Sequence, residues 1–230
     1  QARMQYSIRE PKLTNDINIT GTLNVLLAAR DAGVKRVVYS ASSSAYGHKD
    51  ILPLTEDMRP EPIIPYAIQK RVGEQYCAMA ARFYGLETVA LRYFNVYGPR
   101  QTTASDGPYA TVIGIFLEQR QKGEHLSIVP DGTQRRDFTH VKDVARANLL
   151  AMESDRVGKG EIINIGTGKS HSILEVAEMI GGPWKFSDPR QGEVRATLAD
   201  NTRARDLLGW EPELSFEAGI ADLKKLHQLV

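Results

Sequence analysis

Two apolar segments that alternate with helical patterns constrain the fold of this chain more than any other feature. Residues 34–40 and 86–93 are short runs rich in β-branched residues. Apolar residues at helical spacing fill the segments 13–32 and 65–84, which precede these runs. A helix–strand–helix–strand order is typical of a parallel α/β sheet. We therefore predict an α/β fold that binds its ligands beyond the carboxyl ends of the strands.

Polar side chains follow both predicted strands. A serine run at 40–44 ends the first strand, Asn95 follows the second, and Tyr66 begins the helix between them. The carboxyl ends of parallel strands meet at one edge of a sheet, so we expect these features to converge on one crevice. Convergence of three separate segments favours a binding site over a purely structural explanation of each.

Tyr66 and Lys70 lie four residues apart on the predicted helix and therefore share one helix face. An ammonium near a phenol stabilises the phenolate, which lowers the pKa of the tyrosine from about 10 towards neutrality. A tyrosine tuned in this way can take a proton from a hydroxyl at pH 7 and return it. The spacing alone is common and favours a buried tyrosine beside an exposed lysine. The nearby serine run and Asn95 shift the interpretation towards proton transfer.

The composition argues against several classes of protein. Hydrophobic residues make up 42% of the chain and charged residues 25%, the balance of a globular protein with an ordinary core. The net charge of +1 gives no support to a nucleic-acid surface. Cys77 is the only cysteine, which excludes an internal disulfide and a cysteine-based metal site and fits a reducing compartment. No apolar run approaches the ~20 residues of a membrane span. We expect a cytoplasmic protein without metal, membrane or nucleic-acid partners.

Several motifs occur in an order and at spacings that together resemble one protein family. They are residues 18–26, the run Ser42-Ser43-Ser44-Ala45-Tyr46-Gly47, Pro65-Tyr66-Ala67-Ile68-Gln69-Lys70, residues 91–100, Arg136-Asp137-Phe138 and Leu208-Gly209-Trp210. The chain is similar to extended short-chain dehydrogenase/reductases of the NAD-dependent epimerase/dehydratase family, and within it to UDP-glucose and UDP-N-acetylglucosamine 4-epimerases. The resemblance implies the C-terminal part of a Rossmann-like parallel sheet with a smaller α/β lobe that binds a nucleotide sugar.

The resemblance implies a division of the chain and an assembly. Residues 1–110 match the remaining part of the Rossmann-like domain and carry the catalytic residues. Residues 111–230 match mainly the substrate-binding lobe, with some segments that return to the first domain. A homodimer is implied, in which the helices at 13–32 and 65–84 pair with their counterparts as a four-helix bundle.

The resemblance also implies catalytic and cofactor roles. Ser42 matches a catalytic serine, Tyr66 the catalytic base, and Lys70 its partner, which also holds the nicotinamide ribose of NAD. The other residues that match the surroundings of the cofactor are Asn18, Ser40, Tyr93 and Phe94. In the implied mechanism Tyr66 removes the proton of the C4 hydroxyl while NAD accepts a hydride. The 4-keto sugar then turns over, and the hydride returns to its other face.

The residues that match contacts with the UDP-sugar are Ser42, Ser43, Ser44, Asn95, Arg136, Arg190, Glu193 and Thr197. Arg136 and Arg190 match two arginines that grip the diphosphate, for which guanidinium groups are well suited. Glu193 matches a ribose contact. Related epimerases restricted to plain hexoses have a bulky aromatic residue where this chain has Thr197, so the threonine is expected to leave room for an N-acetyl group.

Ser43 and Ser44 occupy the positions where dehydratases of the family have an acidic pair. Serine hydroxyls cannot replace a carboxylic acid and a carboxylate near pH 7. The chain is therefore expected not to be a 4,6-dehydratase and, on weaker grounds, not a decarboxylase.

One expected motif is missing from the sequence. The 230 residues contain no G-x-x-G-x-x-G loop for the dinucleotide pyrophosphate, and Gly166-Thr167-Gly168 comes too late in the chain to serve. The sequence is expected to be either a fragment or a naturally short protein. In the second case the strand at 37–40 would have an open edge, and NAD would bind weakly or not at all. The alternative function is then a catalytically idle remnant that binds sugar nucleotides.

Overall fold

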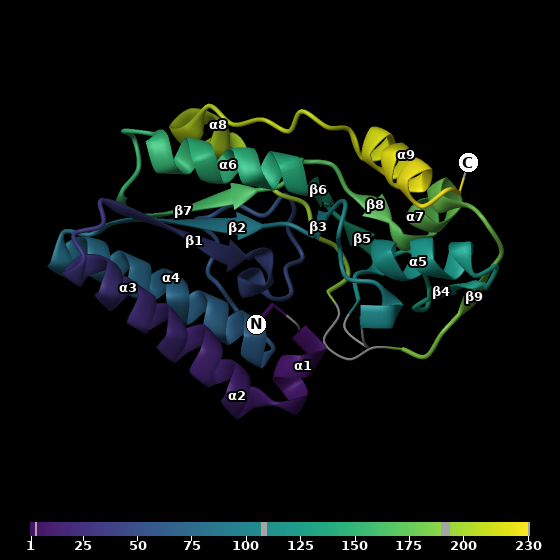
Figure 1. Cartoon of the computed structure of the whole chain (residues 1–230), viewed down its shortest axis with the longest axis horizontal. Coiled ribbons are helices and arrows are strands. Elements are labelled where there is room, and N and C mark those ends of the chain that lie inside the picture. Colours follow the sequence, from purple (N-terminus) through teal and green to yellow (C-terminus); the bar gives the residue numbers. More distant parts are fainter. Residues whose placement is uncertain (3, 107–109, 190–193, 230) are drawn as a thin grey trace.

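Figure 1 shows the computed structural model of the chain, which describes residues 1–2, 4–106, 110–189 and 194–229. Its centre is a parallel sheet with the strand order β1-β2-β7. Helices α3 and α4 cover one face of this sheet, and α6 and α8 cover the other (Figure 1). The predicted α/β fold is confirmed.

Up to residue 106 the elements are α1 (Met4–Arg9), α2 (Pro11–Asn15), the π-helix η1 (Asp16–Thr20), α3 (Gly21–Asp31), β1 (Arg36–Ser42), the 3-10 helix η2 (Ser43–Tyr46), α4 (Pro65–Tyr84), β2 (Glu87–Tyr93), β3 (Val96–Tyr97) and the 3-10 helix η3 (Ala104–Asp106). From residue 110 onward they are α5 (Val112–Gln121), β4 (Leu126–Ile128), β5 (Arg135–Arg136), β6 (Thr139–His140), α6 (Val141–Glu153), β7 (Lys159–Ile165), β8 (His171–Ser172), α7 (Ile173–Ile180), β9 (Trp184–Phe186), α8 (Thr202–Leu208) and α9 (Phe216–Leu226).

The first predicted helix is interrupted in the structure. It begins at Pro11, earlier than predicted, and its middle widens into the π-helix η1 before α3 continues to Asp31. Proline is compatible with the first turn because the missing N–H has no helical partner there. Asn18 lies in the π-helix and is buried, and short π-helical turns often mark functional positions.

The two predicted strands pair with each other as β1 and β2. Their parallel register runs from Arg36 opposite Glu87 to Ser42 opposite Tyr93. Because both strands end at the same level, the residues that follow them lie at one edge of the sheet. Among the described residues β1 pairs with β2 alone, so the other side of β1 has no strand partner. The third strand, β7, comes from the second half of the chain and pairs with β2.

Two large hydrophobic clusters support the site from different sides. One packs β2 and β7 against α6 and α8, with Leu91, Ile163 and Trp210 fully buried. The other lies in the C-terminal lobe, which we define as residues 111–140 and 171–186 together with α9; it includes Phe116, Leu126 and Phe138, and Tyr97 packs with them. The lobe lies beyond the carboxyl ends of β1 and β2 (Figure 1). The cavities described below lie between this lobe and the sheet.

Over the described residues we find no helix that combines the length and the apolar character needed to cross a membrane.

Candidate active site

A cavity of about 520 Å³ lies where the carboxyl ends of β1 and β2 meet the start of α4. Its wall contains most of the residues that the sequence predicted for the site: Ser42, Ser43, Ser44, Tyr66, Tyr93, Asn95, Arg136 and Thr197. These residues come from separate parts of the chain. The expected convergence of the serine run, Tyr66 and Asn95 on one crevice is confirmed.

Tyr66 is held at the beginning of α4 by a contact that the sequence did not reveal. The helix starts at Pro65 after the extended residue Ile64, which offers no side-chain cap. Instead, the main-chain N–H of Tyr66 donates to Oγ of the buried Ser7 at 3.0 Å. Helix α1, which supplies this serine, was not predicted. It orients the first turn of α4 by satisfying one of its free N–H groups.

The prediction of a lowered pKa for Tyr66 is wrong for the chain alone. Burial raises the pKa of Tyr66 above its ordinary value, and a hydrogen bond with the Ser42 side chain opposes this rise only in part. Only 8% of Tyr66 is exposed, so desolvation of the phenolate outweighs the favourable contacts. The ammonium of Lys70 lies 5.9 Å from the centre of the Tyr66 ring.

Lys70 is fixed between the strand end and two aromatic rings. Its Nζ donates to the carbonyl of Ser40 at 2.7 Å and lies 5.1 Å from the centre of the Tyr39 ring. Burial lowers the pKa of Lys70 because the charged form is partly removed from water. The lysine therefore reaches the carboxyl end of β1, where Ser40 is exposed.

Ser42 keeps a proton that it can donate. It is the N-cap of η2, and its Oγ accepts hydrogen bonds from the N–H of Ser44 at 3.2 Å and from the Ser44 hydroxyl at 2.9 Å. Both contacts use Ser42 as an acceptor, so its own hydroxyl hydrogen remains for Tyr66 or a ligand. The turn ends at Gly47, where a Cβ would lie 1.9 Å from the Glu61 carbonyl oxygen.

Tyr93 ends β2 and Phe94 follows it, and their side chains face opposite directions. Tyr93 lines the cavity, and its hydroxyl donates to Oδ1 of Asn148 at 2.8 Å and lies 3.2 Å from Oγ of Ser40. Phe94 is fully buried against Tyr46, and it is not part of the cavity wall. Successive side chains of an extended chain alternate between faces, so Phe94 points away from the cavity that Tyr93 lines, and its contact with the cofactor remains a prediction.

Asn95 and Thr197 hold each other in the cavity wall. Nδ2 of Asn95 donates to the carbonyl of Asp137 at 3.0 Å and to Oγ1 of Thr197 at 3.1 Å. A hydrogen bond from Nδ2 of Asn95 to a UDP-sugar, which the resemblance implies as a contact, would need one of these contacts to be exchanged. The nearby Arg136 donates through Nη1 to the carbonyl of Arg135 at 2.9 Å.

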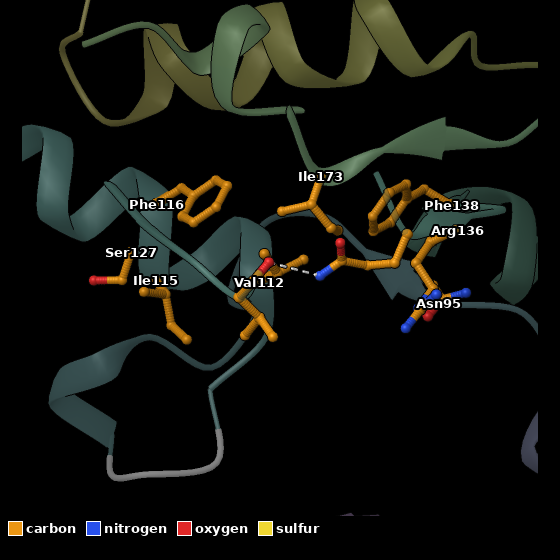
Figure 2. Close-up of a pocket in the computed structure, with 10 residues that line it drawn as sticks. Asn95, Val112, Ile115, Phe116, Ser127, Arg136, Phe138 and Ile173 are labelled. Carbon is orange, nitrogen blue, oxygen red and sulfur yellow. Dashed lines mark hydrogen bonds between the residues drawn. The ribbon is translucent and has the colours of Figure 1, made fainter. Parts of the chain in front are cut away.

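A second cavity of about 100 Å³ adjoins the first (Figure 2). The two share Asn95, Val112 and Arg136, and the smaller one extends between Phe116 and Phe138 towards Ile173 (Figure 2). The sequence did not predict this cavity. Its wall comes from the N-terminal half of α5, the segments around β4 and β5, Asn95 and the start of α7, which are distant in the sequence.

Two predicted contacts of the substrate, Arg190 and Glu193, lie outside the described residues. They remain predictions from the sequence.

Comparisons with known proteins agree with these observations. The model of the NAD dependent epimerase/dehydratase family matches residues 1–166. A putative UDP-glucose 4-epimerase of Methanocaldococcus jannaschii is 39% identical over 227 residues, which cover 96% of this chain and 72% of that protein. A UDP-glucose 4-epimerase of Mycolicibacterium smegmatis is 37% identical and is covered to 71% of its length.

The chain belongs to the NAD-dependent epimerase/dehydratase family.

Solved structures show the same fold. The crystal structure of a UDP-glucose 4-epimerase from Thermotoga maritima with UDP-glucose superposes on this chain with a TM-score of 0.92 and 39% identity. The match covers 100% of this chain and 75% of the Thermotoga chain. A UDP-N-acetylglucosamine 4-epimerase from Methanobrevibacter ruminantium covers this chain equally, with a TM-score of 0.92 and 37% identity, over 74% of that chain. The resemblance inferred from the motifs is therefore confirmed.

The residues around Lys70 fit the nicotinamide end of the cofactor that this family uses. The Lys70 ammonium, the exposed Ser40 and the hydroxyl of Tyr93 meet at the carboxyl ends of β1 and β2, beside Tyr66. They offer the donors that a ribose and a carboxamide need. The described sequence supplies no glycine-rich loop for the pyrophosphate, so the fit concerns this end of the cofactor only.

Asn18 is buried, and its side chain is engaged in hydrogen bonds within the chain. Its Nδ2 donates to Oε1 of Gln69 at 2.8 Å and to the carbonyl of Gln1 at 2.9 Å, and only 5% of the residue is exposed. Gln69 in turn donates to Oγ1 of Thr14 at 3.0 Å. This buried network joins η1 and α2 to α4 next to Lys70. Asn18 therefore contacts the helix that carries Tyr66 and Lys70, and its contact with NAD remains a prediction.

Proposed function

We propose that the chain carries the proton-transfer and substrate-binding parts of an NAD-dependent UDP-sugar 4-epimerase. The observation that carries this proposal is the pair of joined cavities: the larger contains Ser42 and Tyr66, and the smaller meets it at Arg136. A nucleotide sugar has three parts in the same order, a sugar, a diphosphate and a base. The similarity to UDP-glucose and UDP-N-acetylglucosamine 4-epimerases supports this assignment.

Tyr66 is the proposed acid and base. It lines the cavity at the helix start, where it can take the proton of the C4 hydroxyl and return it later. Ser42 interacts with Tyr66 and has a hydroxyl hydrogen to donate, so it can hold the sugar oxygen during the transfer. NAD, when bound, supplies the reversible oxidation at C4. The pKa of Tyr66 is raised in the chain alone although Lys70 is present, so a further positive charge, such as that of the oxidised cofactor, has to favour the phenolate.

The other polar residues orient the two ligands. Lys70, Ser40 and Tyr93 are proposed to bind the nicotinamide ribose and its neighbourhood. Arg136 is proposed to bind the diphosphate, because a guanidinium forms paired hydrogen bonds with phosphate oxygens. In this division, residues 1–110 supply most of the chemistry and residues 111–230 most of the recognition.

A turnover assay tests the proposal. The chain is incubated with NAD and UDP-galactose, UDP-glucose or their N-acetyl forms, and the two C4 epimers are separated by chromatography. The expected result is a mixture of epimers from either starting sugar. If the chain binds UDP but forms no C4 epimer at saturating NAD, the enzymatic assignment is contradicted.

Thr197 leads to a narrower proposal on the substrate. It is 8% exposed, lies in the wall of the larger cavity, and is smaller than the aromatic residue of plain-hexose epimerases. We infer that the cavity admits an N-acetyl group at C2 of the sugar. Comparison of kcat/KM for UDP-GlcNAc and UDP-glucose tests this, and a clear preference for UDP-glucose would overturn it.

We also propose a homodimer formed through α3 and α4. Val25 on α3 and Phe83 on α4 are 60% and 69% exposed, and further apolar residues are exposed on α2 and α4. Exposed apolar residues on neighbouring helices of this kind are typical of interfaces. Light scattering should give twice the mass of one chain, and Phe83→Glu should shift the protein towards the monomer. A monomeric wild type at micromolar concentration would contradict the proposal.

The single cysteine supports a cytoplasmic location. Cys77 is a buried free thiol on α4, which suits a reducing compartment. Cell fractionation tests this, and recovery from an oxidising compartment would contradict it.

A further inference from the structure

Asp137 is a fully buried acid behind the wall shared by the two cavities. It directly follows Arg136 at the end of β5, and its exposed fraction is 0%. Arg136 is half-buried and belongs to the wall of both cavities, whereas Asp137 belongs to neither wall. Asp137 therefore cannot contact a ligand directly, and its effect on the site has to pass through its neighbours.

Each hydrogen bond that the Asp137 carboxylate accepts comes from one of two loops. Oδ1 accepts from the N–H of Thr167 at 2.8 Å and from its hydroxyl at 2.7 Å. Oδ2 accepts from the N–H of Gly168 and from the N–H of Ala199, each at 3.0 Å. Three of these four contacts come from main-chain N–H groups, which can only donate; together with the Thr167 hydroxyl they favour the ionised carboxylate and oppose the rise in the pKa of Asp137 that burial causes. Hydrogen bonds to a charged acceptor are about twice as strong as neutral ones.

The main chain of Asp137 holds two residues of the cavity wall. Its N–H donates to Oγ1 of Thr197 at 3.2 Å, and its carbonyl accepts from Nδ2 of Asn95 at 3.0 Å. Nδ2 of Asn95 also donates to Oγ1 of Thr197 at 3.1 Å. The three residues form a closed set of hydrogen bonds. Thr197 cannot move away from the wall without breaking its contacts with both of the others.

The segment held by Asp137 is also tightly packed against Gly166. A Cβ on Gly166 would lie 2.4 Å from Cβ of Ala199 and 3.0 Å from Oδ2 of Asp137. Only a glycine at this position lets the segment approach the carboxylate so closely. Ala199 is itself 3% exposed. The side chain of Asp137 thus fixes Ala199, its main chain fixes Thr197, and the segment 197–199 has little freedom between them.

We propose that Asp137 is a positioning residue that sets the shape of the sugar-facing cavity: its carboxylate fixes segment 197–199, and thereby the place of the Thr197 side chain beside the sugar. The role is specificity rather than chemistry. This inference rests on the proposed function, because it takes the larger cavity to hold the sugar of a UDP-sugar.

The test replaces the carboxylate by an amide of the same shape. In Asp137→Asn, one oxygen becomes an NH2 group that faces two N–H donors. Binding of UDP, UDP-glucose and UDP-GlcNAc to the full chain with NAD present is measured by calorimetry. The expected result is that the ratio of the Kd values for the two UDP-sugars changes by about tenfold, which corresponds to about 1.4 kcal/mol. Amide hydrogen exchange at Thr197 and Ala199 should become faster as well.

Asp143→Asn is the matched control. Asp143 is 3% exposed, and its carboxylate accepts from the N–H groups of Glu213 and Leu214 at 3.1 and 3.2 Å, outside both cavity walls. This variant should lower the melting temperature without changing the Kd ratio. If Asp137 had only a structural role, Asp137→Asn would likewise lower the melting temperature without changing the Kd ratio. If Asp137→Asn does not fold, Thr167→Val removes one donor to Oδ1 outside the cavity and should change the ratio in the same direction.

Two results would overturn the inference. One is a Kd ratio in Asp137→Asn, or in Thr167→Val where the first variant does not fold, that equals the ratio of the wild type. The other is unchanged amide exchange at Thr197 and Ala199. A wild type that binds none of the three ligands would refute the proposed function instead, and amide exchange would still decide whether Asp137 fixes the segment.

Discussion

The sheet region and the C-terminal lobe contribute to the candidate site in different ways. The sheet region, which we define as β1, β2 and β7 with α3, α4, α6 and α8, places Ser42 through a continuous register of seven residue pairs on β1 and β2, and Tyr66 through the first turn of α4. The lobe side of the site depends on short segments such as β5 and β6, each two residues long, and on side-chain hydrogen bonds such as those of Asp137. The residues proposed for proton transfer thus lie next to a long hydrogen-bonded strand pair. The residues proposed for substrate binding depend on local contacts that single substitutions can change.

The two regions also differ in what their cores contain. Arg92 on β2 and Glu74 on α4 form an ion pair with both side chains 0% exposed. The arginine also lies over the ring of Tyr46, 4.5 Å from its centre. The largest cluster of the lobe is made of apolar and aromatic residues, among them Phe116, Phe138 and Phe216. The sheet region is therefore more sensitive to the loss of one charge, and the lobe to changes of volume.

The largest expected effect separates chemistry from recognition. Tyr66→Phe removes the phenolic proton and should lower kcat by about 10²- to 10⁴-fold. The Kd for UDP should remain unchanged, because Arg136 and the smaller cavity are intact. Steady-state turnover and calorimetry measure the two quantities. Equal losses of turnover and UDP affinity would mean that the two regions do not divide the work in this way.

Glu74→Gln tests the buried charge of the sheet region. The substitution leaves Arg92 without its counter-ion in a dry environment and should destabilise the fold by about 3–5 kcal/mol. Urea denaturation measures the free energy of unfolding. The matched control is Asp16→Asn, which breaks the exposed pair between Lys12 and Asp16 and should cost less than about 1 kcal/mol. Similar costs for both variants would contradict the proposed difference between buried and exposed pairs.

Arg136→Gln tests recognition from the lobe side. Loss of charge-assisted hydrogen bonds to a diphosphate should weaken UDP binding by about 1.5–3 kcal/mol, or roughly 10- to 150-fold. Affinity for uridine, which has no diphosphate, should change little. The free energy of unfolding should also change little, because the guanidinium is half-buried at the cavity wall. Equal losses for uridine and UDP would place the diphosphate elsewhere.

His140 gives a smaller, pH-dependent effect where the two regions meet. It is the N-cap of α6, and its Nδ1 accepts from the N–H of Lys142 at 3.2 Å. Burial lowers the pKa of His140 below its ordinary value, and the negative charge of Asp143 opposes this shift. A lowered pKa in the folded state means that the contribution of the neutral imidazole to stability is present above about pH 6.5 and is lost as the pH falls.

The corresponding measurement is the free energy of unfolding between pH 7 and pH 5. Protonation of Nδ1 removes a helix cap worth about 1 kcal/mol, so the wild type should lose this amount relative to His140→Asn, which keeps a capping acceptor that does not titrate. Parallel pH profiles of the two proteins would contradict the assignment.

Most of the fold was predictable because its signals are local. The apolar runs placed β1 and β2 to within two residues, and the helix that carries Tyr66 was found from its periodicity. Helix α1 and strand β9 were missed. Helix α1 is six residues long, and Trp184–Phe186 is exposed, so neither carries a clear pattern of burial.

The candidate site was predictable where a motif marks it. Ser42, Tyr66 and Asn95 follow or begin regular elements, and the topology of a parallel sheet brings such positions together. The capping of α4 by Ser7, the burial of Phe94 and the role of Asp137 depend on contacts between residues far apart in the sequence, and no local pattern indicates them.

The sequence by itself determined that this chain forms a parallel α/β sheet with a tyrosine and a lysine at its ligand-binding edge. Periodicity and turn residues act over a few positions, and they are written in the chain directly. Only the tertiary structure decided in which direction the pKa of that tyrosine shifts. The Tyr66–Lys70 spacing suggested a lowered pKa, yet burial raises it, because desolvation depends on every segment that packs around the phenol.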